Sequence, residues 1–431
     1  MISIGFYTLG CKVSQYETEA IAEEFERRGY ELADFSNKND VYLINTCTVT
    51  AEADRKSRQI IRRAKKINPS AKIIVCGCYS QRSPEEVLNI DGVDAVIGSA
   101  GKMNAPDIAE RLFKGETKIK EVSDIDNEPF ESMRITRGPR TRVYVKIEDG
   151  CESKCTYCAI PSARGRVRSK PREDVISEIE ALSASGVAEI VLTGIETGSY
   201  GADFDDKYRL KDLIRELNDR KSAHLIRLGS LAPELIGADF VNTVKDLEIL
   251  APHFHLSIQS GSDNVLKRMK RRYSRAMALE NIKRIREAIP DATFTTDVMV
   301  GFPGESDEDF LDTVSFIKEA RFLDAHVFAY SRRKETQAAT YPDQIPENIK
   351  RERSEALITA AKEVRNEVLL AIVTSKKPLK CIFEERRDDG WYGHASNFAE
   401  VIVKSNDNLH GVQKSVIPKS LSNGIIYGKL V

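Results

Sequence analysis

The stretch VYVKIEDGCESKCTYC, residues 143–158, decides the fold of the middle of this chain. It begins with an apolar segment, Val143–Glu148, that predicts a buried strand. It ends in three cysteines with the spacing C-x3-C-x2-C, which are Cys151, Cys155 and Cys158. The cysteines therefore lie on the loop that leaves the carboxyl end of a strand. Folds built from alternating strands and helices place their chemistry on such loops, so we expect a functional site here.

Five more strands follow in the same part of the chain, each separated from the next by a helical pattern. Their predicted ranges are Ile190–Thr193, Leu225–Gly229, His253–Ile258, Thr293–Val300 and Ala325–Ala329. Six strand–helix units in residues 143–345 predict an α/β domain in the form of an open or partial (β/α) barrel.

Residues 1–125 alternate strand and helix in the same way. We expect strands at Ile2–Thr8, Val41–Asn45, Lys72–Cys76 and Ala95–Ile97, and helices at Gln15–Arg28, Glu52–Ile67 and Asp107–Lys114. This alternation predicts a doubly wound parallel sheet, which makes the chain a multidomain α/β protein.

Two connecting segments and a small β module complete the chain. Residues 126–142 are polar and contain several Pro and Gly residues, as expected of a linker. Residues 346–374 predict one long helix, opened by a proline at its favourable first turn. In residues 375–431 the pattern changes to short strands, predicted at Leu379–Glu384, Trp391–Ala395, Glu400–Lys404 and Ile425–Leu430. These strands predict a small all-β barrel.

The composition is typical of a globular cytoplasmic protein. The 431 residues suggest about three domains, and a hydrophobic content of 41% is ample for folded cores. The start of the sequence lacks the basic and apolar regions of a signal peptide, and no run of about 18 apolar residues predicts a membrane span. The net charge of −1 excludes a polycation, so an anionic partner must meet local basic patches. Eight cysteines in a reducing compartment are expected to be thiols or metal ligands.

The three cysteines of residues 151–158, here called the loop triad, have the chemistry of a metal site. Three thiolates on one short loop can bind three irons of a [4Fe–4S] cluster and leave the fourth iron open. Soft thiolates also bind zinc, but a structural zinc site needs four ligands and no fourth cysteine or histidine lies nearby in the sequence. A zinc site is kept as the alternative.

A second set of cysteines, here called the dispersed triad, is spread over the N-terminal region. Cys11, Cys47 and Cys78 each follow one of the first three predicted strands, and parallel strands end at one edge of a sheet. We therefore expect the three thiols to converge on a second metal site. Buried free cysteine is the alternative, because cysteine is a common small core residue. We assign that structural role to Cys76 and Cys381.

The chain as a whole resembles the methylthiotransferases of the radical S-adenosylmethionine (SAM) superfamily over nearly all of its length. The segments that support this resemblance are Thr8–Cys11, Asn45–Thr50, Gly77–Gln81, Gly150–Cys158, Ala163–Gly165, Gln259–Ser262, Asp297–Gly304 and His326–Phe328. Together they are far more specific than the C-x3-C-x2-C spacing, which alone indicates only the superfamily. Residues 375–431 resemble, with a weaker signature, the RNA-binding TRAM domain of this family.

The resemblance implies two [4Fe–4S] clusters and SAM as cofactors. The loop triad would bind the cluster that cleaves SAM with an electron from an external donor, and the dispersed triad an auxiliary cluster that handles sulfur. Residues expected to contact SAM are Tyr157, Gly194, Glu196, Ser230, Gln259 and Asp297. The alternative for the glycine-rich positions is that the glycines only form turns and contact no ligand. Glu196 departs from the family, whose members often have a neutral polar group near here, and Ser162 stands where relatives usually have a larger side chain.

Within the family, residues 45–58 most resemble members that act on N6-threonylcarbamoyladenosine beside the anticodon of tRNA. The expected reaction converts this nucleoside to its 2-methylthio derivative. The threonylcarbamoyl group has a carboxylate, which an arginine can hold by two parallel hydrogen bonds. Candidate arginines near the cysteine sites are Arg55, Arg58, Arg164 and Arg166. No acid–base pair of side chains is needed, because removal of an aromatic hydrogen is radical chemistry that the cofactors perform.

Basic residues occur in four bursts that favour a nucleic-acid partner. They are Arg134, Arg137, Arg140 and Arg142; Arg164, Arg166, Arg168, Lys170 and Arg172; Lys267, Arg268, Lys270, Arg271 and Arg272; and Arg332, Arg333 and Lys334. A charge run is usually a solvated face, but several of these flank the expected mouth of the site, which favours contacts to tRNA phosphates. Residues 375–431 add nine Lys and Arg against six Asp and Glu. We expect no DNA or membrane partner.

Three other functions share some of these features. Isopentenyladenosine in tRNA and a ribosomal protein are alternative substrates within the family. Residues 45–58 argue against the first, and Asn45–Thr50 with the basic bursts argues against the second. The third alternative is a non-catalytic, zinc-bearing RNA-binding protein, which the SAM-type loops and the missing fourth ligand argue against.

Overall fold

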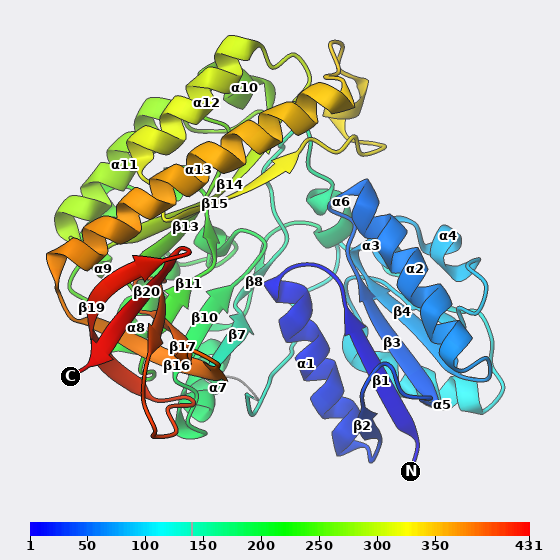
Figure 1. Ribbon diagram of the computed structural model, residues 1–431. Coiled ribbons are helices and arrows are strands. Elements are labelled where there is room, and N and C mark those ends of the chain that lie inside the picture. The colour runs from blue at the N-terminus through cyan, green and yellow to red at the C-terminus, as the bar shows by residue number, and fades with distance from the viewer. Residues whose placement is uncertain (139–140) are drawn as a thin grey trace.

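The computed structural model describes residues 1–138 and 141–431 and shows three domains in chain order (Figure 1). Pro139 of the predicted linker and Arg140 of the first basic burst lie outside the described residues. An N-terminal α/β domain lies beside a larger central α/β domain, and a small β barrel packs at one end of the central domain. The long helix α13 (Glu347–Ser375) runs along the outside of the central domain and leads into the β barrel. The predicted fold class is confirmed.

The N-terminal domain contains a parallel sheet with the strand order β2-β1-β3-β4-β5-β6. The strands are β1 (Ser3–Thr8), β2 (Glu31–Ala33), β3 (Val41–Thr46), β4 (Lys72–Gly77), β5 (Ala95–Ile97) and β6 (Ile119–Glu121). Central strand β3 is buried along its whole length, as its sequence VYLINT predicts. Edge strands β2 and β6 were not predicted, because three residues are too short to show a period.

Helices cover both faces of this sheet, so it is doubly wound as predicted. Helices α1 (Lys12–Arg27) and α5 (Ala105–Phe113) pack on one face, where Phe25 and Ile108 join the core. Helices α2 (Ala51–Ile67) and α4 (Pro84–Leu88) pack on the other face, and the short α3 (Cys78–Arg82) continues directly from β4. Helix α2 begins where the Thr50 hydroxyl accepts a hydrogen bond from the Ala53 amide at 3.1 Å.

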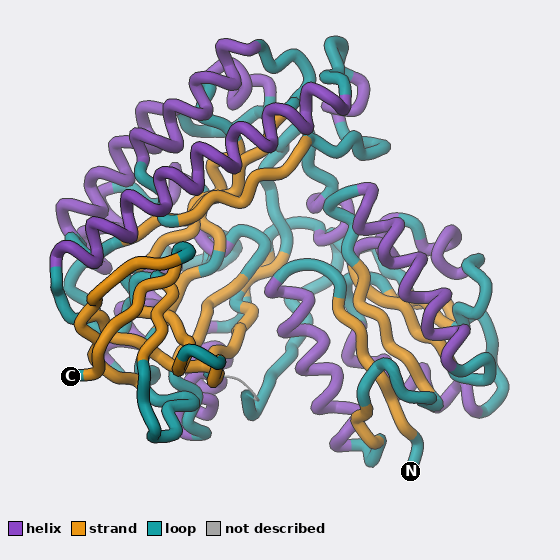
Figure 2. The backbone as a smooth tube through the Cα atoms, viewed as in Figure 1, coloured by secondary structure: helices purple, strands orange, loops and turns teal. Residues whose placement is uncertain are grey.

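The central domain is an open barrel of parallel strands (Figure 2). Its strands are β7 (Arg142–Lys146), β10 (Glu189–Thr193), β11 (Ile226–Leu228), β12 (Ser230–Leu231), β13 (His253–Gln259), β14 (Thr293–Val300) and β15 (Asp324–Ala329). The predicted strand Leu225–Gly229 is instead two short strands, β11 and β12, with Gly229 between them. An isolated parallel bridge between Ile226 of β11 and Leu250, just before β13, connects the two sheets of the open barrel.

Helices line the outside of the open barrel. They are α7 (Arg172–Ala184), α8 (Leu210–Asp219), α9 (Ala238–Val244), α10 (Asp263–Arg268), α11 (Arg275–Ala288) and α12 (Asp307–Ala320). At the open side, helix α1 of the N-terminal domain contacts β7. There the Tyr16 hydroxyl donates to the Met133 carbonyl at 2.7 Å and to Glu178 Oε1 at 3.0 Å. Tyr16 is fully buried. The two α/β domains therefore share a continuous core.

The C-terminal module is a closed five-stranded barrel, as predicted, with the order β16-β17-β18-β20-β19. The strands are β16 (Leu379–Arg387), β17 (Gly390–Ala395), β18 (Glu400–Val403), β19 (Gln413–Ser422) and β20 (Ile425–Leu430). Strand β19 was not predicted, because Pro418 argues against a strand; the structure places this proline where the register with β20 shifts.

The β barrel docks on the amino-terminal ends of the central strands through one turn. The Arg227 guanidinium donates to the Ser396 carbonyl at 3.0 Å, and the Phe398 ring stacks on His253 with centroids 4.4 Å apart. Among the described residues, no helix is both long and apolar enough to cross a membrane.

Candidate active site with two cysteine triads

The loop triad is held on a short antiparallel ribbon at the carboxyl end of β7. Strands β8 (Glu148–Asp149) and β9 (Arg168–Ser169) form the ribbon, and α6 (Ile160–Arg164) lies between them in sequence. Gly150 has φ of +90°, and a Cβ there would lie 1.9 Å from the Arg166 carbonyl oxygen, so only glycine fits. The Cys151 amide donates to the Gly165 carbonyl at 3.0 Å, which closes the base of the loop.

Each thiol of the loop triad has a hydrogen-bond donor nearby. The amide of Ser153 donates to Cys151 Sγ and the amide of Ile160 to Cys158 Sγ, both at 3.4 Å. The Arg271 guanidinium donates to Cys155 Sγ at 3.4 Å. Burial raises the pKa of Cys158 to about 12. Such a thiol becomes a thiolate when a metal replaces its proton, and the N–H donors then stabilise the charge on sulfur.

The dispersed triad converges at the carboxyl edge of the N-terminal sheet, because β1, β3 and β4 are neighbours. Thr8 lies opposite Asn45, and Thr46 lies opposite Gly77, so Cys11, Cys47 and Cys78 emerge from adjacent strands. Gly77 has φ of +99°, and a Cβ there would meet Asn45 Oδ1 at 2.5 Å, so the turn that directs Cys78 needs glycine.

The thiols of the dispersed triad influence one another electrostatically. Burial, with smaller contributions from the nearby Cys78 and Cys11, raises the pKa of Cys47 to about 12. Cys11 is exposed, Cys47 is half-buried and Cys78 is buried. All eight cysteines are free thiols, so both triads can ligate a metal.

Both triads fit an iron–sulfur cluster in the chemistry of their donors. Thiolates are the usual ligands of such clusters, and N–H groups directed at their sulfurs are among the features that tune them. Across residues 1–138 and 141–431, no three His, Cys, Asp or Glu side chains are arranged to hold a single metal ion. In a four-iron cluster each thiolate binds a different iron, so the thiols stand farther apart than the ligands of one ion.

A buried charge network joins the two triads across the domain boundary. Arg164 of α6 donates to Glu17 Oε1 of α1 at 2.5 Å and to Asp149 Oδ2 at 3.1 Å, and its Nε donates to Cys78 Sγ at 3.1 Å. Arg164 is fully buried. We had expected this arginine to contact substrate, but the structure shows all of its nitrogens bound to protein groups.

The residues expected to contact SAM come from four neighbouring strands and the cysteine loop. Gly194 follows β10, Ser230 lies in β12, Gln259 ends β13 and Asp297 lies in β14. Tyr157 packs edge-on against Phe302, with ring centroids 6.5 Å apart. Gly194 lies directly against Glu148, because a Cβ at this glycine would be 2.4 Å from Glu148 Oε2. These residues lie at the carboxyl half of the barrel. A molecule bound to a metal site at the loop triad has to lie in the same place.

Glu196 is a half-buried residue in which the charged form of the carboxyl group is disfavoured. It accepts a hydrogen bond from the Ala232 amide at 2.9 Å, and its own amide donates to Glu148 Oε2 at 2.9 Å. Burial raises the pKa of Glu196 to about 7, and burial also raises that of Glu148 well above its ordinary value. The surroundings near the cysteine loop thus favour the neutral form of both carboxyl groups.

Asp297 is engaged by two histidines on the inner face of the barrel. His255 Nε2 and His326 Nδ1 each lie 3.2 Å from its carboxylate oxygens. Although burial opposes ionisation, these hydrogen bonds keep the pKa of Asp297 below its ordinary value. His326 is largely exposed, so open space lies beside this cluster.

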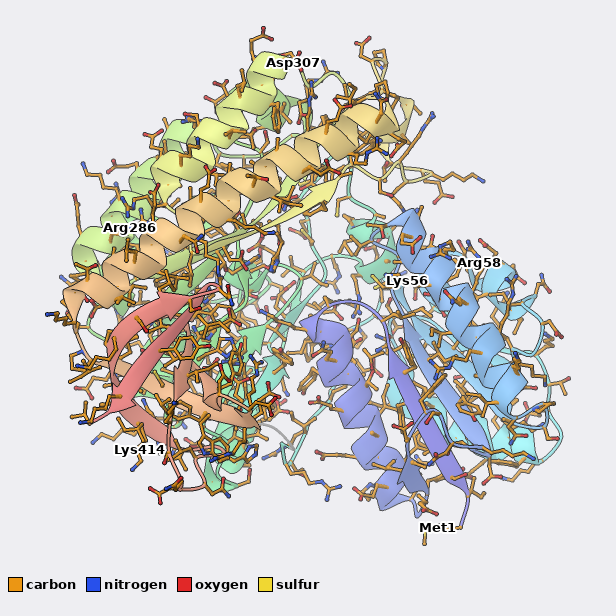
Figure 3. The ribbon with its side chains drawn as sticks, viewed as in Figure 1. Met1, Lys56, Arg58, Arg286, Asp307 and Lys414 are labelled. Carbon is orange, nitrogen blue, oxygen red and sulfur yellow. The ribbon has the colours of Figure 1, made fainter. Side chains whose placement is uncertain are left out.

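The other arginines expected to contact substrate differ in their exposure and in their hydrogen-bond partners. Arg55 is exposed and pairs with Glu52 at 2.6 Å. Arg58 donates to the Tyr79 hydroxyl at 2.8 Å and lies 3.4 Å from Glu86 of α4, so it is on the side of α2 that faces α3 and α4 (Figure 3). Arg166 is exposed and its Nε donates to the Asp126 carbonyl at 2.9 Å.

Two residues of this site were not singled out from the sequence. Arg271 contacts Cys155, although it was noted only as part of a basic burst. Lys12 follows Cys11 directly, and its ammonium lies 6.0 Å from the centre of the Tyr144 ring on β7. Lys12 could have been identified from the sequence, because it lies next to a predicted metal ligand. Arg271 could not, because it is remote in sequence from every cysteine.

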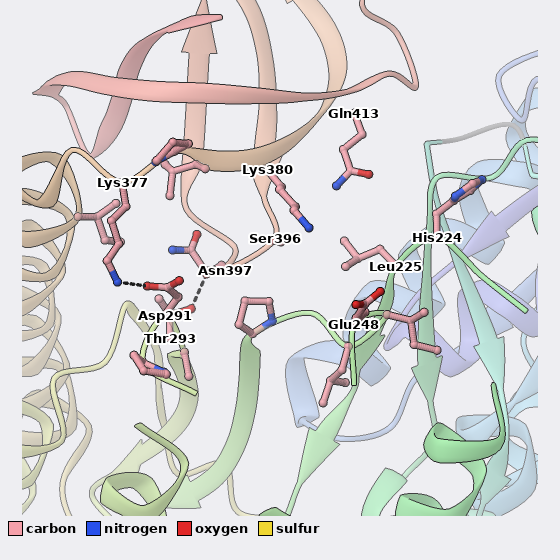
Figure 4. Close-up of a pocket in the computed structure, with 18 of the residues that line it drawn as sticks. His224, Leu225, Glu248, Asp291, Thr293, Lys377, Lys380, Ser396, Asn397 and Gln413 are labelled. Carbon is pink, nitrogen blue, oxygen red and sulfur yellow. Dashed lines mark hydrogen bonds and ion pairs between the residues drawn. The ribbon is translucent and has the colours of Figure 1, made fainter. Parts of the chain in front are cut away.

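A cavity of about 1090 Å³ lies at the opposite end of the barrel from the cysteines. It is enclosed between the central domain and the β barrel, and Leu225, Thr293, Lys380 and Gln413 are among its lining residues (Figure 4). Leu225 precedes β11 and Thr293 begins β14, so this cavity faces the amino-terminal strand ends. Reactions of this fold take place at the other edge, so we do not assign the reaction to it.

Comparisons with protein-family models agree with this geometry. Residues 145–317 match the model of the radical SAM superfamily, and residues 3–98 match that of an uncharacterized protein family, UPF0004. The fold and the loop triad thus define the class as a radical SAM protein with an additional cysteine-bearing domain.

Curated relatives narrow the class. The threonylcarbamoyladenosine tRNA methylthiotransferase MtaB of Bacillus subtilis is 40% identical over 100% of this chain and 96% of its own length. The MtaB of Thermotoga maritima is 37% identical over 99% and 96%. The tRNA-2-methylthio-N(6)-dimethylallyladenosine synthase of Clostridium botulinum is 34% identical over 83% and 79%. The chain belongs to the radical SAM methylthiotransferase family.

Solved structures support the fold of the two α/β domains. The radical SAM methyltransferase TsrM from Kitasatospora setae, with cobalamin and a [4Fe–4S] cluster bound, has a TM-score of 0.57 and 14% identity, with 78% of this chain and 77% of that chain covered. The cobalamin-dependent radical SAM enzyme OxsB has a TM-score of 0.52 at 12% identity, with 88% and 62% covered. At this identity the likeness concerns the fold alone.

Proposed function

We propose that this enzyme converts N6-threonylcarbamoyladenosine beside the anticodon of tRNA to its 2-methylthio derivative, with two [4Fe–4S] clusters and SAM. The convergence of two separate cysteine triads toward one interdomain space carries the proposal, together with full-length relatives named for this reaction. One triad alone would account for SAM cleavage but leave the sulfur chemistry without a site.

The two triads have different tasks in this proposal. When bound, the clusters and SAM supply the radical that removes hydrogen from the adenine and the methylthio group that replaces it. The loop triad would leave one iron open for SAM. The residues that would contact SAM there are Tyr157, Gly194, Glu196, Ser230, Gln259 and Asp297. A neutral Glu196 can accept and donate hydrogen bonds without repelling a carboxylate ligand. The dispersed triad faces the same space from the N-terminal domain.

Recognition of the threonylcarbamoyl group requires a donor for its carboxylate. Arg55, Arg58 and Arg166 stay candidates, and we add Lys12 as the one that lies nearest both domains. Among the described residues, no carboxylate lies within ion-pair distance of Lys12 Nζ. Burial lowers the pKa of Lys12, Arg227 and Arg142 of the barrel act in the same direction, and Asp297 opposes them. An anionic side chain of the substrate would stabilise the ammonium against these effects.

The partners follow from this reaction. The substrate is tRNA, a cytoplasmic molecule, and its phosphates are met by the exposed members of the basic bursts and by residues 375–431. Four members of the bursts are buried and pair within the protein instead, which corrects the expectation for Arg164, Arg168, Lys170 and Arg333. An external donor supplies electrons to the cluster of the loop triad. Neither DNA nor a membrane has a role in the reaction.

Mass spectrometry of tRNA nucleosides tests the substrate. We expect 2-methylthio-threonylcarbamoyladenosine in cells that contain the enzyme and none in cells with the Cys151→Ala variant. Isopentenyladenosine in the same tRNA pool serves as the competing substrate, because some relatives are named for its dimethylallyl modification. Equal methylthiolation of isopentenyladenosine would overturn the substrate and leave the two-cluster chemistry standing.

Metal analysis tests the cofactors separately. Anaerobic protein should contain about eight irons, as expected for two cysteine-ligated four-iron clusters. Alanine at all three positions of the dispersed triad should remove about half of the iron and stop methylthio transfer, while SAM cleavage continues. If this variant retains all of its iron, the auxiliary cluster is wrong.

A further inference from the structure

One arginine connects the two cysteine sites through direct bonds. Arg164 lies six residues after Cys158, so it belongs to the segment that holds the loop triad. Its Nε nevertheless donates to Cys78 Sγ at 3.1 Å, and Cys78 belongs to the dispersed triad on the other domain. Among the contacts of the described residues, this is the one that joins the thiol of one triad to the peptide segment of the other.

The orientation of Arg164 is fixed by two carboxylates. Nη1 donates to Glu17 Oε1 at 2.5 Å and to Asp149 Oδ2 at 3.1 Å, while Nη2 donates to Glu17 Oε2 at 3.1 Å. The side chain is fully buried, as is that of Glu17. Because both terminal nitrogens are held, the planar guanidinium cannot rotate, and its Nε–H is aimed at the sulfur.

The surrounding charges leave room for one more anion. Lys102 and Lys146 also bind Glu17, and Lys146 lies 3.3 Å from Asp149. With Arg168, which lies 3.8 Å from Asp149, four buried cations thus surround these two carboxylates. The Cys78 sulfur therefore lies beside a cluster of buried positive charge, which favours an anionic ligand group at this place.

We propose that Arg164 is a positioning residue that holds the Cys78 thiolate and raises the reduction potential of the auxiliary cluster. This inference rests on the proposed auxiliary cluster. Reduction adds negative charge that spreads onto the ligand sulfurs, so an N–H bond and a nearby positive charge stabilise the reduced state more than the oxidised one. Since Arg164 belongs to the segment of the loop triad, the same bond ties that segment to a cysteine of the dispersed triad.

The loop triad has its own arginine, which provides an internal comparison. Arg271 donates to Cys155 Sγ at 3.4 Å and to the Ser257 carbonyl at 3.0 Å, and it contacts no thiol of the dispersed triad. Substitutions at Arg164 and at Arg271 should therefore act on different clusters.

The test is a redox titration of full-length, cluster-loaded protein followed by electron paramagnetic resonance. SAM binds only the cluster of the loop triad, so the signal that changes on addition of SAM identifies that cluster and the unchanged signal the auxiliary one. Arg164→Lys keeps a cation between the carboxylates but loses the fork that reaches the sulfur. Arg164→Gln removes the charge as well. Lys146→Met is the matched control, because Lys146 binds the same two carboxylates and no thiol.

We expect the auxiliary signal of both Arg164 variants to titrate at a more negative potential. A tenfold fall in the ratio of reduced to oxidised cluster at fixed potential corresponds to about 59 mV for one electron. Lys146→Met should shift this potential less than Arg164→Gln does, because it removes a nearby charge but no bond to sulfur, and Arg271→Lys should shift only the SAM-responsive signal. An unchanged auxiliary potential in both Arg164 variants would overturn the inference. A shift of equal size in Lys146→Met would also overturn it, because the network charge and not the sulfur bond would then be the cause.

Failure of the underlying proposal looks different in the same measurements. If only one iron–sulfur signal is present in the unmodified protein, the auxiliary cluster is wrong and Arg164 has no cluster to tune. If two signals are present and neither responds to Arg164, only the role of Arg164 is wrong.

Discussion

Cys76 and Cys78 are separated by a single glycine, yet their thiols lie in different environments. Cys76 is fully buried among apolar side chains on the face of the sheet that α1 and α5 cover. Cys78 Sγ accepts a hydrogen bond from Arg164 at the domain boundary. A continuing strand would place these two residues on the same face, but β4 ends at Gly77, whose positive φ turns the chain so that Cys78 begins α3.

This difference predicts opposite results for two alanine substitutions. Cys78→Ala should remove one ligand of the auxiliary cluster and stop methylthio transfer, with SAM cleavage retained. Cys76→Ala should keep both activities and lose about 1 kcal/mol of stability, as a small cavity in a packed core costs. Iron content and product analysis by mass spectrometry measure both. Transfer that depends on Cys76 and not on Cys78 would show that the other thiol is the ligand.

Glu196 predicts a pH dependence of stability. Burial raises its pKa to about 7, so the folded state binds its proton more tightly than the unfolded state does. The stability that this proton contributes is complete below the ordinary carboxyl pKa and is lost as the pH rises through about 7. Glu196→Gln, which stays neutral, should therefore gain stability over the unmodified protein between pH 5 and pH 8, by on the order of 3 kcal/mol.

Urea unfolding of the metal-free chain at several pH values measures this difference. Glu148 is present in both proteins, so its own titration largely cancels in the comparison. A constant difference between the two proteins from pH 5 to pH 8 would mean that Glu196 is ionised throughout.

The fold was predictable where the pattern is long and regular. The central strand β3 and helix α2 show their periods clearly, and both triads follow strands whose ends the sequence marks. The short edge strands β2 and β6 have no period of their own, because pairing with a longer neighbour defines them. Strand β19 contains a proline, which the sequence rules assign to an edge or a bulge.

The candidate site was predictable only in part, because burial and partners depend on the tertiary structure. The dispersed triad could be inferred from parallel strand ends. The fate of Arg164 could not, since Glu17, Asp149 and Cys78 come from three separate segments. Arg271 likewise reaches Cys155 from a position 116 residues away.

The basic bursts and the β barrel predict a phosphate-dominated interface with tRNA. The affinity should fall steeply with salt, because each phosphate that a Lys or Arg neutralises releases counterions. Deletion of residues 375–431 is a poor test, because Phe398 packs on His253 inside the barrel end. Glutamine at the exposed Lys404, Lys414 and Lys419 is the cleaner change.

We expect this triple variant to bind tRNA more weakly and to show a smaller salt slope, with SAM cleavage unchanged. Filter binding at several salt concentrations measures both quantities. Glutamine at Lys211, Lys283 and Lys318, which lie on helices of the central domain, provides a control of equal charge change. Equal losses in the two variants would mean that the β barrel has no special part in binding.

The last prediction concerns the carboxylate of the threonylcarbamoyl group. Lys12→Met keeps the length of the side chain and removes its charge. A hydrogen bond to a charged group contributes about 1.5–3 kcal/mol, so methylthio transfer should fall by roughly ten- to a hundredfold. The iron content and SAM cleavage should stay unchanged, because Lys12 ligates nothing in either triad. Lys56→Met is the matched control, since Lys56 is exposed on α2 (Figure 3). Rates are compared on tRNA with and without the threonylcarbamoyl group. If Lys12→Met and Lys56→Met behave alike on the modified tRNA, Lys12 does not hold the carboxylate, and Arg166 becomes the next residue to substitute.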